Sequence, residues 1–158
     1  MTKTKSSITD AAPTAPRGCT NFKLRQLLRR VSLVYDRAMA DCGLKTTQYS
    51  LLSHVEKLGP ITQAELAKAM AMDSSTLSRN LKPLQSAGWV AIQVGDDARS
   101  HALTMTASGR KKRAEARALW KRAQLQLNDV VGLEDIVALH GLIDRMSDAL
   151  SLETEEAA

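Results

Sequence analysis

The side chains of this chain that are best placed for chemistry lie in one short segment, residues 74–87. On a helical wheel, Leu77, Leu81 and Leu84 share one face, at i, i+4 and i+7. Hydroxyl and cationic side chains occur on the other sides of the same helix: Ser74, Ser75, Thr76, Ser78, Arg79, Lys82 and Ser86. Small hydroxyl side chains let a helix approach base edges closely, and an arginine fork pairs with two acceptors on guanine. The chemistry that this face suggests is hydrogen bonding to nucleic-acid bases.

Three cations in this region suggest three different contacts. Arg79 is expected to read a base pair, with about 1–3 kcal/mol of discrimination against the wrong base. Lys82 is expected to meet a phosphate and so to position the helix. Arg99 follows a turn and is expected to enter a narrow minor groove, whose enhanced negative potential attracts arginine. Asp97 repels DNA by charge and is expected to hold that turn in shape. The alternative for both segments is an ordinary solvated surface.

No other set of residues in the chain suggests a reaction. The sequence contains no G-x-S-x-G, no P-loop and no dinucleotide-binding fingerprint. Its two cysteines, Cys19 and Cys42, lack metal-ligand spacing, and its three histidines are scattered. The sequence therefore predicts neither an enzyme, nor a metal site, nor a cofactor.

Length and charge restrict the class of protein and its partners. A chain of 158 residues is about one domain long. Its net charge of +5 favours a polyanionic partner such as nucleic acid. No apolar run approaches the ~20 residues that a membrane span needs, and no signal peptide is visible. We expect a cytoplasmic protein that does not enter the membrane.

The elements that must position the polar segment can be predicted from their caps. Thr62-Gln63-Ala64-Glu65 is a capping box that begins a helix ending near Met70. Asp73 or Ser74 caps the polar helix, which Gly88 closes. Alternating apolar residues over 90–94 predict a strand, a turn follows at 95–97, and residues 101–105 return as its partner. Two short helices followed by a hairpin predict a winged helix-turn-helix over residues 47–105.

Longer helices are predicted on both sides of this unit. They cover about residues 21–41, 106–127 and 133–150, with a further helix at about 47–58. Their apolar stripes exceed what a small winged helix can cover, so a second copy of the chain is the expected partner. We therefore predict a mostly α fold with a small β-hairpin wing and long helices that form a dimerisation region. The predicted division is a disordered tail (1–17), an N-terminal dimerisation helix (18–46), the DNA-binding region (47–105), C-terminal dimerisation helices (106–152) and a tail (153–158).

Several motifs resemble those of the MarR family of bacterial winged-helix regulators. They are Gly43-Leu44-x-x-x-Gln48-Tyr49-x-x-Leu52, Leu77-Ser78-Arg79, Leu84-x-x-x-Gly88-Trp89-Val90 and Asp97-x-Arg99-Ser100-x-x-Leu103-x-Met105-Thr106-x-x-Gly109. The likeness spans about residues 20–150. It implies a homodimeric, ligand-responsive repressor on a pseudo-palindromic operator, with the 74–87 helix in the major groove and Arg99 in the minor groove. One departure is that many relatives carry arginines on the first wing strand, where this chain has Ile92 and Gln93.

The resemblance implies two kinds of signal. Some members sense small aromatic or anionic molecules, for which Arg29, Tyr35 and His54 are the candidate ligand-binding residues. Other members sense oxidants through a cysteine. Cys19 is the redox candidate, because amides at a helix N-terminus lower a thiol pKa. Counting back from Gln48, however, the family's peroxide-sensing cysteine position is occupied by Asn21.

Two other classes of protein stay open from the sequence. A non-specific architectural DNA-binding protein would bind all DNA with similar affinity, whereas specific binding is typically ~10³-fold or more tighter than non-specific binding. The hydroxyl-rich face argues for specificity, because a coating protein is expected to carry more lysine there. An interaction domain or enzyme on a winged-helix scaffold would show no affinity for DNA.

Overall fold

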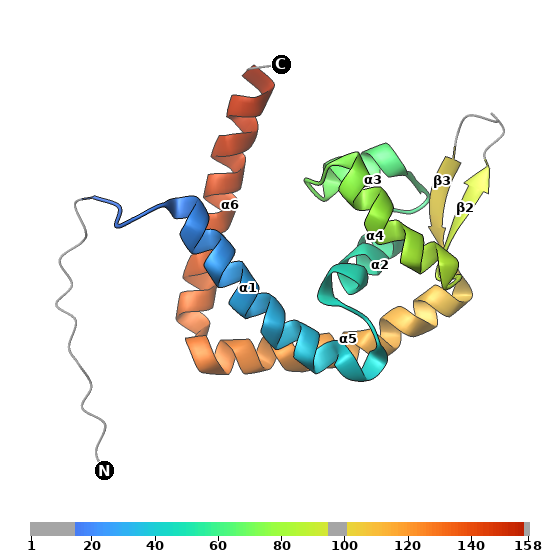
Figure 1. Ribbon diagram of the computed structural model, residues 1–158, viewed down its shortest axis with the longest axis horizontal. Helices are drawn as coiled ribbons and strands as arrows, with labels where there is room; N and C mark the ends of the chain where they lie inside the picture. The colour runs from blue at the N-terminus through green and yellow to red at the C-terminus, as the bar shows by residue number, and fades with distance from the viewer. Residues whose placement is uncertain (1–14, 95–100, 157–158) are drawn as a thin grey trace, which may run out of the picture.

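The computed structural model describes residues 15–94 and 101–156, and it confirms the predicted fold class. Its elements, in chain order, are α1 (Thr20–Met39), the 3₁₀ turn η1 (Ala40–Cys42), α2 (Thr46–Leu58), β1 (Ile61–Thr62), α3 (Gln63–Ala69), α4 (Ser74–Ser86), β2 (Val90–Val94), β3 (His101–Met105), α5 (Ala107–Val131) and α6 (Leu133–Glu156). Figure 1 shows two parts: α2, α3, α4 and the sheet form one unit, and α1, α5 and α6 form an open frame beside it. The turn expected at 95–97, with Asp97 and Arg99, lies outside the described residues.

The helix starts follow the caps read from the sequence. The Thr62 hydroxyl accepts a hydrogen bond from the Glu65 amide at 3.2 Å, and the Glu65 carboxylate accepts one from the Thr62 amide at 2.9 Å. The Asp73 carboxylate accepts from the Thr76 amide at 2.8 Å and so caps α4. Each bond satisfies an amide that has no partner within its own helix. These capping predictions are confirmed.

The sheet has three strands in the order β1-β3-β2, all antiparallel. Ile61 on β1 and Ile92 on β2 both pair with Leu103 on the central strand. The sequence did not predict β1, because two residues carry no alternation and their partner strand lies about 40 positions further along the chain. The sheet joins the start of α3 to the hairpin.

Leucines from each helix of the winged unit form its core. Leu77, Leu81 and Leu84 of α4 are fully buried, as predicted, together with Leu52 of α2 and Leu66 of α3. Burying one such side chain contributes about 1.5–3 kcal/mol relative to leaving it exposed. The inward leucines therefore fix which side of α4 faces solvent.

α5 connects the winged unit to the frame. Its N-cap, Thr106, accepts from the Gly109 amide at 3.0 Å and donates to the Gly88 carbonyl at 2.7 Å. Ser108 donates to the same carbonyl at 2.9 Å. Gly109 lies so close to the hairpin that a Cβ there would meet the Trp89 carbonyl oxygen at 2.1 Å. The start of α5 is thus locked to the end of α4.

The long helices run further than predicted. α5 continues past Leu127 to Val131, where Gly132 adopts a φ of 102° that side-chain-bearing residues rarely adopt, and α6 begins at once. α6 continues past Leu150 to Glu156, because residues 151–156 include no glycine or proline that would end it. α1 ends earlier than predicted, at Met39, and η1 occupies the next three residues.

Candidate nucleic-acid interface

The predicted base-reading residues gather on the solvent-facing side of α4. Ser74, Ser75, Ser78, Arg79 and Lys82 are exposed, and Thr76 is half-buried at the edge of the face. The exposed face contains no apolar side chain larger than that of Pro83. The fold therefore brings together six of the seven DNA-contact residues that we predicted. The seventh, Arg99, lies outside the described residues.

Asp73 organises the N-terminal end of this face. Its carboxylate accepts from the Ser75 hydroxyl at 2.6 Å as well as from the Thr76 amide at 2.8 Å. The Ser75 hydroxyl bond is the larger cause, and the Thr76 bonds the next, of an Asp73 pKa held well below its usual range. Because the Ser75 hydroxyl donates to Asp73, its lone pairs stay free to accept from an amino group of cytosine or adenine. Sequence analysis assigned Asp73 only a capping role.

Arg79 is held in place by a neighbour on the same face. Its Nη2 atom donates to the Thr76 hydroxyl oxygen at 3.2 Å. This bond fixes the side chain along the helix while leaving most of its donors free for base acceptors. Lys82 is exposed and has no hydrogen bond or ion pair among the described residues. The two cations therefore differ in that Arg79 has a hydrogen-bond partner on its own helix and Lys82 has none among the described residues.

The hairpin beside α4 carries little charge on its described residues. Ile92 on β2 is 55% exposed, and Ala91 and Gln93 are exposed as well. The hairpin strands pair from Val90↔Met105 to Val94↔His101. The described side chains of this strand are therefore apolar or amide groups, and none of them is a cation.

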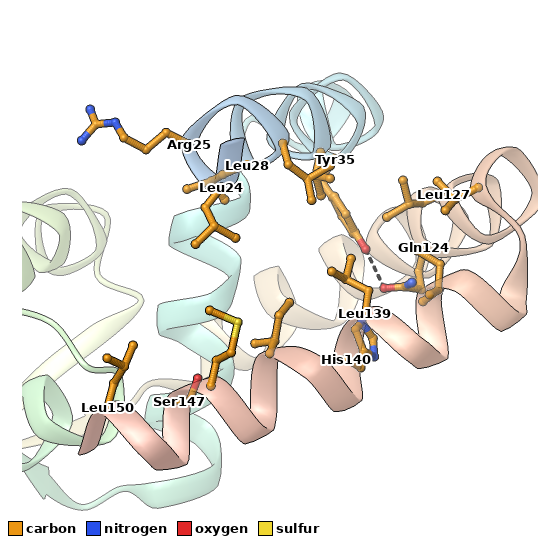
Figure 2. A pocket seen from close by; sticks show the side chains of 16 residues that line it. Leu24, Arg25, Leu28, Tyr35, Gln124, Leu127, Leu139, His140, Ser147 and Leu150 are labelled. Carbon is orange, nitrogen blue, oxygen red and sulfur yellow. Dashed lines mark hydrogen bonds between the residues drawn. The ribbon is translucent and has the colours of Figure 1, made fainter. Parts of the chain in front are cut away.

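A second feature is a cavity of about 530 Å³ between α1, α5 and α6 (Figure 2). Its walls are largely aliphatic, and they are formed by Leu24, Arg25, Leu27, Leu28, Val31, Tyr35, Gln124, Leu127, Val131, Ile136, Leu139, His140, Ile143, Met146, Ser147 and Leu150. The Tyr35 hydroxyl donates to Gln124 Oε1 inside it, and Gln124 Nε2 donates to Asn128 at 2.9 Å. Burial raises the pKa of Tyr35, so the ring stays a neutral phenol at physiological pH. Arg25 extends away from the other lining side chains.

The three predicted ligand-binding residues do not share this cavity. Tyr35 lines it, whereas Arg29 is exposed elsewhere on α1. His54 lies on α2, and its Nδ1 is 2.8 Å from the Ser50 carbonyl oxygen, a contact within one helix turn. The structure adds Gln124 and His140, which sequence analysis did not assign to a ligand site. The one signal in the sequence was that Gln124 interrupts the apolar stripe of α5.

The two cysteines occupy different environments. Cys19 is exposed at the N-cap of α1, and its side chain makes no capping hydrogen bond. Cys42 is buried, and its thiol donates to the Met39 carbonyl at 3.1 Å.

Two other kinds of site are absent from residues 15–94 and 101–156. Across those ranges no three His, Cys, Asp or Glu side chains are grouped so as to hold a metal ion. In the same ranges no helix combines the length and apolarity that a membrane span requires.

Known proteins resemble this chain in sequence and in structure. A MarR family model matches residues 43–100. The M. tuberculosis transcriptional regulator MosR, solved in complex with DNA, is 30% identical; the match covers 82% of this chain and 98% of MosR, with a TM-score of 0.66. A probable transcriptional regulator from Pseudomonas aeruginosa is 25% identical over 80% of this chain and 96% of its own, with a TM-score of 0.73. YwoH of Bacillus subtilis (strain 168), an uncharacterized HTH-type transcriptional regulator, is 28% identical over 93 residues, 59% of this chain and 68% of YwoH.

Proposed function

The chain belongs to the MarR family of winged-helix, DNA-binding transcriptional regulators, and on that premise we propose that it is a homodimeric repressor of a specific operator. The observation that carries this proposal is the exposed face of α4, where hydroxyls and an arginine bonded to Thr76 project from a helix fixed by buried leucines. α4 would lie in the major groove with Arg79 on a guanine and Lys82 on a phosphate. Arg99 would reach the minor groove beside it.

The apolar frame supports the homodimer. α1, α5 and α6 leave many large apolar side chains exposed to solvent, among them Leu24, Leu27, Leu28, Leu125, Val130, Leu133, Val137, Leu142 and Ile143. A monomer rarely exposes a continuous apolar surface of this kind. A second copy related by a two-fold axis would cover it and present two α4 helices to half-sites about 34–36 Å apart. The operator would then be a pseudo-palindrome.

The cavity supports a small-molecule effector. A volume of 530 Å³ falls within the usual range for ligand sites, about 300–1,000 Å³. The Tyr35 hydroxyl and the Gln124 amide supply hydrogen-bonding groups in otherwise aliphatic walls. This lining suits an aromatic compound with one polar group better than an anion. Once a second copy covers the frame, a compound in the cavity would contact both copies and change how they sit together.

The test is fluorescence anisotropy of the purified protein on DNA from its own upstream region, at about 150 mM salt with random DNA as competitor. Selective binding that Arg79→Ala weakens would support the proposal. Equal affinity for all DNA would indicate an architectural protein, and no affinity for any DNA would contradict the function. Sedimentation velocity on the same sample tests the dimer.

The oxidant-sensing alternative is tested in the same assay. Mild peroxide is added to the wild-type protein and to Cys19→Ser. Release of DNA by peroxide only when Cys19 is present would make the chain a redox switch. If both proteins still bind DNA after peroxide treatment, a small-molecule effector remains the proposed signal. A screen of aromatic compounds would then follow.

A further inference from the structure

The most basic helix of this chain is not the base-reading one. Residues 110–122 of α5 contain seven of the chain's 22 Lys and Arg residues and one of its 17 Asp and Glu residues. This segment alone has a net charge of +6, so the rest of the chain together is slightly acidic. α4, by contrast, carries two cations. α5 is therefore the most basic helix of the chain, followed by α1, which carries five cations and one acid.

Five of these cations share one side of α5. At 100° per residue, Arg110, Lys111, Arg117, Lys121 and Arg122 fall within an arc of about 140°, and all five are exposed. We call these five residues the basic face. The other residues of this segment within the arc are Ala114 and Ala118, both exposed and both small. A linear polyanion can therefore approach the helix closely along about 18 Å of its length.

Two of the five cations of the basic face have an acidic partner: Arg110 lies 3.6 Å from Glu56, and Arg122 lies 4.0 Å from Asp41. Lys111, Arg117 and Lys121 have no ion pair or hydrogen bond among the described residues. Arg117 and Lys121 are spaced i and i+4, where like charges destabilise a helix by about 0.2–0.5 kcal/mol. The single acid of the segment, Glu115, pairs instead with Lys112 at 3.1 Å. A bound polyanion would relieve this repulsion.

The packing of α5 favours nucleic acid over a membrane surface. A helix that lies on a membrane must insert an apolar face below the headgroups. In α5 that face is already occupied: Ala116 and Ala123 are fully buried, and Trp120 lies 5.9 Å from the Tyr49 ring. What remains exposed along this segment is charge and small side chains.

The position of the basic face connects it to the base-reading helix. Ser108, two residues before the basic face begins, donates to the carbonyl of Gly88 at the end of α4. Figure 1 shows α5 starting beside the C-terminal end of α4 and the base of the hairpin, then running away from them. Arg79 and Gly88 are nine residues apart, about 14 Å along the helix axis, and the basic face begins two residues after Ser108, which contacts Gly88. The two surfaces are therefore close enough for one DNA duplex to contact both.

We propose that the basic face of α5 binds phosphates of the same DNA duplex, in the segment that flanks the site read by α4. These contacts are independent of sequence and add affinity where the first wing strand lacks cations. The inference rests on the proposed DNA-binding function. It goes beyond that function because it adds a second DNA-binding surface outside the winged unit.

The experiment compares Lys111→Gln/Lys121→Gln/Arg117→Gln with a charge-matched control, Arg37→Gln/Lys45→Gln/Lys57→Gln. The control removes three exposed cations outside α5 that have no ion pair among the described residues. Affinity is measured between 50 and 200 mM salt on a duplex of about 20 base pairs that holds both half-sites and on one extended to about 40. Circular dichroism and sedimentation show that the fold and the oligomeric state are unchanged.

The α5 variant should bind the long duplex at least tenfold more weakly than the control does at about 150 mM salt, with a salt slope shallower by about 0.9 for each lost phosphate contact. The wild-type protein should bind the long duplex more tightly than the short one, and the α5 variant should lose this difference. The ratio of its affinity for the operator to its affinity for random DNA should equal that of the wild-type protein. A salt slope equal to that of the control overturns the inference. An unchanged preference for the long duplex shows that the basic face does not contact the flanking DNA.

Loss of binding to phosphatidylserine vesicles with unchanged DNA binding would instead identify a membrane surface as the partner. Failure of the proposed function is distinguishable, because the wild-type protein would then bind neither duplex.

Discussion

At the scale of single residues, the two cations of α4 should differ in what they contribute to DNA binding. Arg79→Ala should weaken operator binding by about 1–3 kcal/mol and reduce the preference for one base pair, because a bidentate contact is lost. Lys82→Ala should weaken all duplexes alike, and the salt slope should become shallower by about one for each phosphate contact removed. Anisotropy against a set of single-base operator variants measures both effects. Equal loss of specificity in the two variants would contradict the assignment of roles.

Asp73 should make the α4 cap sensitive to acid. Its hydrogen bonds to Ser75 and Thr76 lower its pKa in the folded protein below the value of about 3.9 expected in the unfolded chain. The stabilisation is therefore fully present above about pH 4 and is lost as the pH falls from there toward the lowered pKa. Asp73→Asn keeps an acceptor for the Thr76 amide but removes the charge.

Urea unfolding at several pH values between about 2.5 and 6 measures this effect. The free energy of unfolding changes with pH only where the folded and unfolded states bind different numbers of protons. The wild-type protein should lose more stability with falling pH than Asp73→Asn does. Identical pH profiles for the two proteins would contradict the role of Asp73.

At the scale of elements, the junction between the hairpin and α5 should tolerate no extra atom. A Cβ at Gly109 would lie 2.1 Å from the Trp89 carbonyl oxygen and 2.6 Å from the Met105 sulfur. Gly109→Ala should therefore destabilise the fold by about 1–3 kcal/mol or more, as overpacking does. At Gly141 in α6 the nearest atom would be Arg145 Nη1 at 3.5 Å, the end of a flexible side chain. Gly141→Ala should leave stability unchanged or raise it, and chemical denaturation compares the two.

Elements with local signals could be predicted from the sequence, whereas those that depend on distant partners could not. The start of α3 and the start of α4 depend on a capping residue three positions from its partner. Thr62 marked the first correctly, and of the two predicted caps of α4, Asp73 and Ser74, the structure has Asp73. The strand β1 depends on Leu103, far along the chain, and no local pattern indicated it. The side chain of Gln124 lines the cavity only because α1 and α6 pack beside α5, which the sequence pattern does not show.

At the scale of the whole molecule, dimerisation through the apolar frame should be needed for the protein to bind two half-sites at once. Ile143 lines the cavity and is 44% exposed. Ile143→Glu should produce a folded monomer at micromolar concentration, because a charge cannot be buried without a partner. Operator affinity should fall by about 10²-fold or more, since the gain from linking two binding units is lost. Sedimentation velocity and anisotropy measure both changes.

The matched control for this prediction lies on another helix. Leu58 at the end of α2 is 37% exposed and does not line the cavity. Leu58→Glu introduces the same charge outside the frame and should leave the dimer intact. If Ile143→Glu remains dimeric, this face of α6 is not the surface where the copies meet.

The hydrogen bonds from Thr106 and Ser108 to the Gly88 carbonyl couple the motion of α5 to that of the winged unit. The 25 residues of α5 form a rod about 37 Å long, with the winged unit attached at one end and α6 at the other. If α5 tilts by about 5° about its C-terminal end, its N-terminal end, which carries the winged unit, moves by about 3 Å. This displacement is close to the 3.4 Å rise of one base pair. A change at the frame too small to alter any single contact within the winged unit would thus shift α4 by about one step along the DNA.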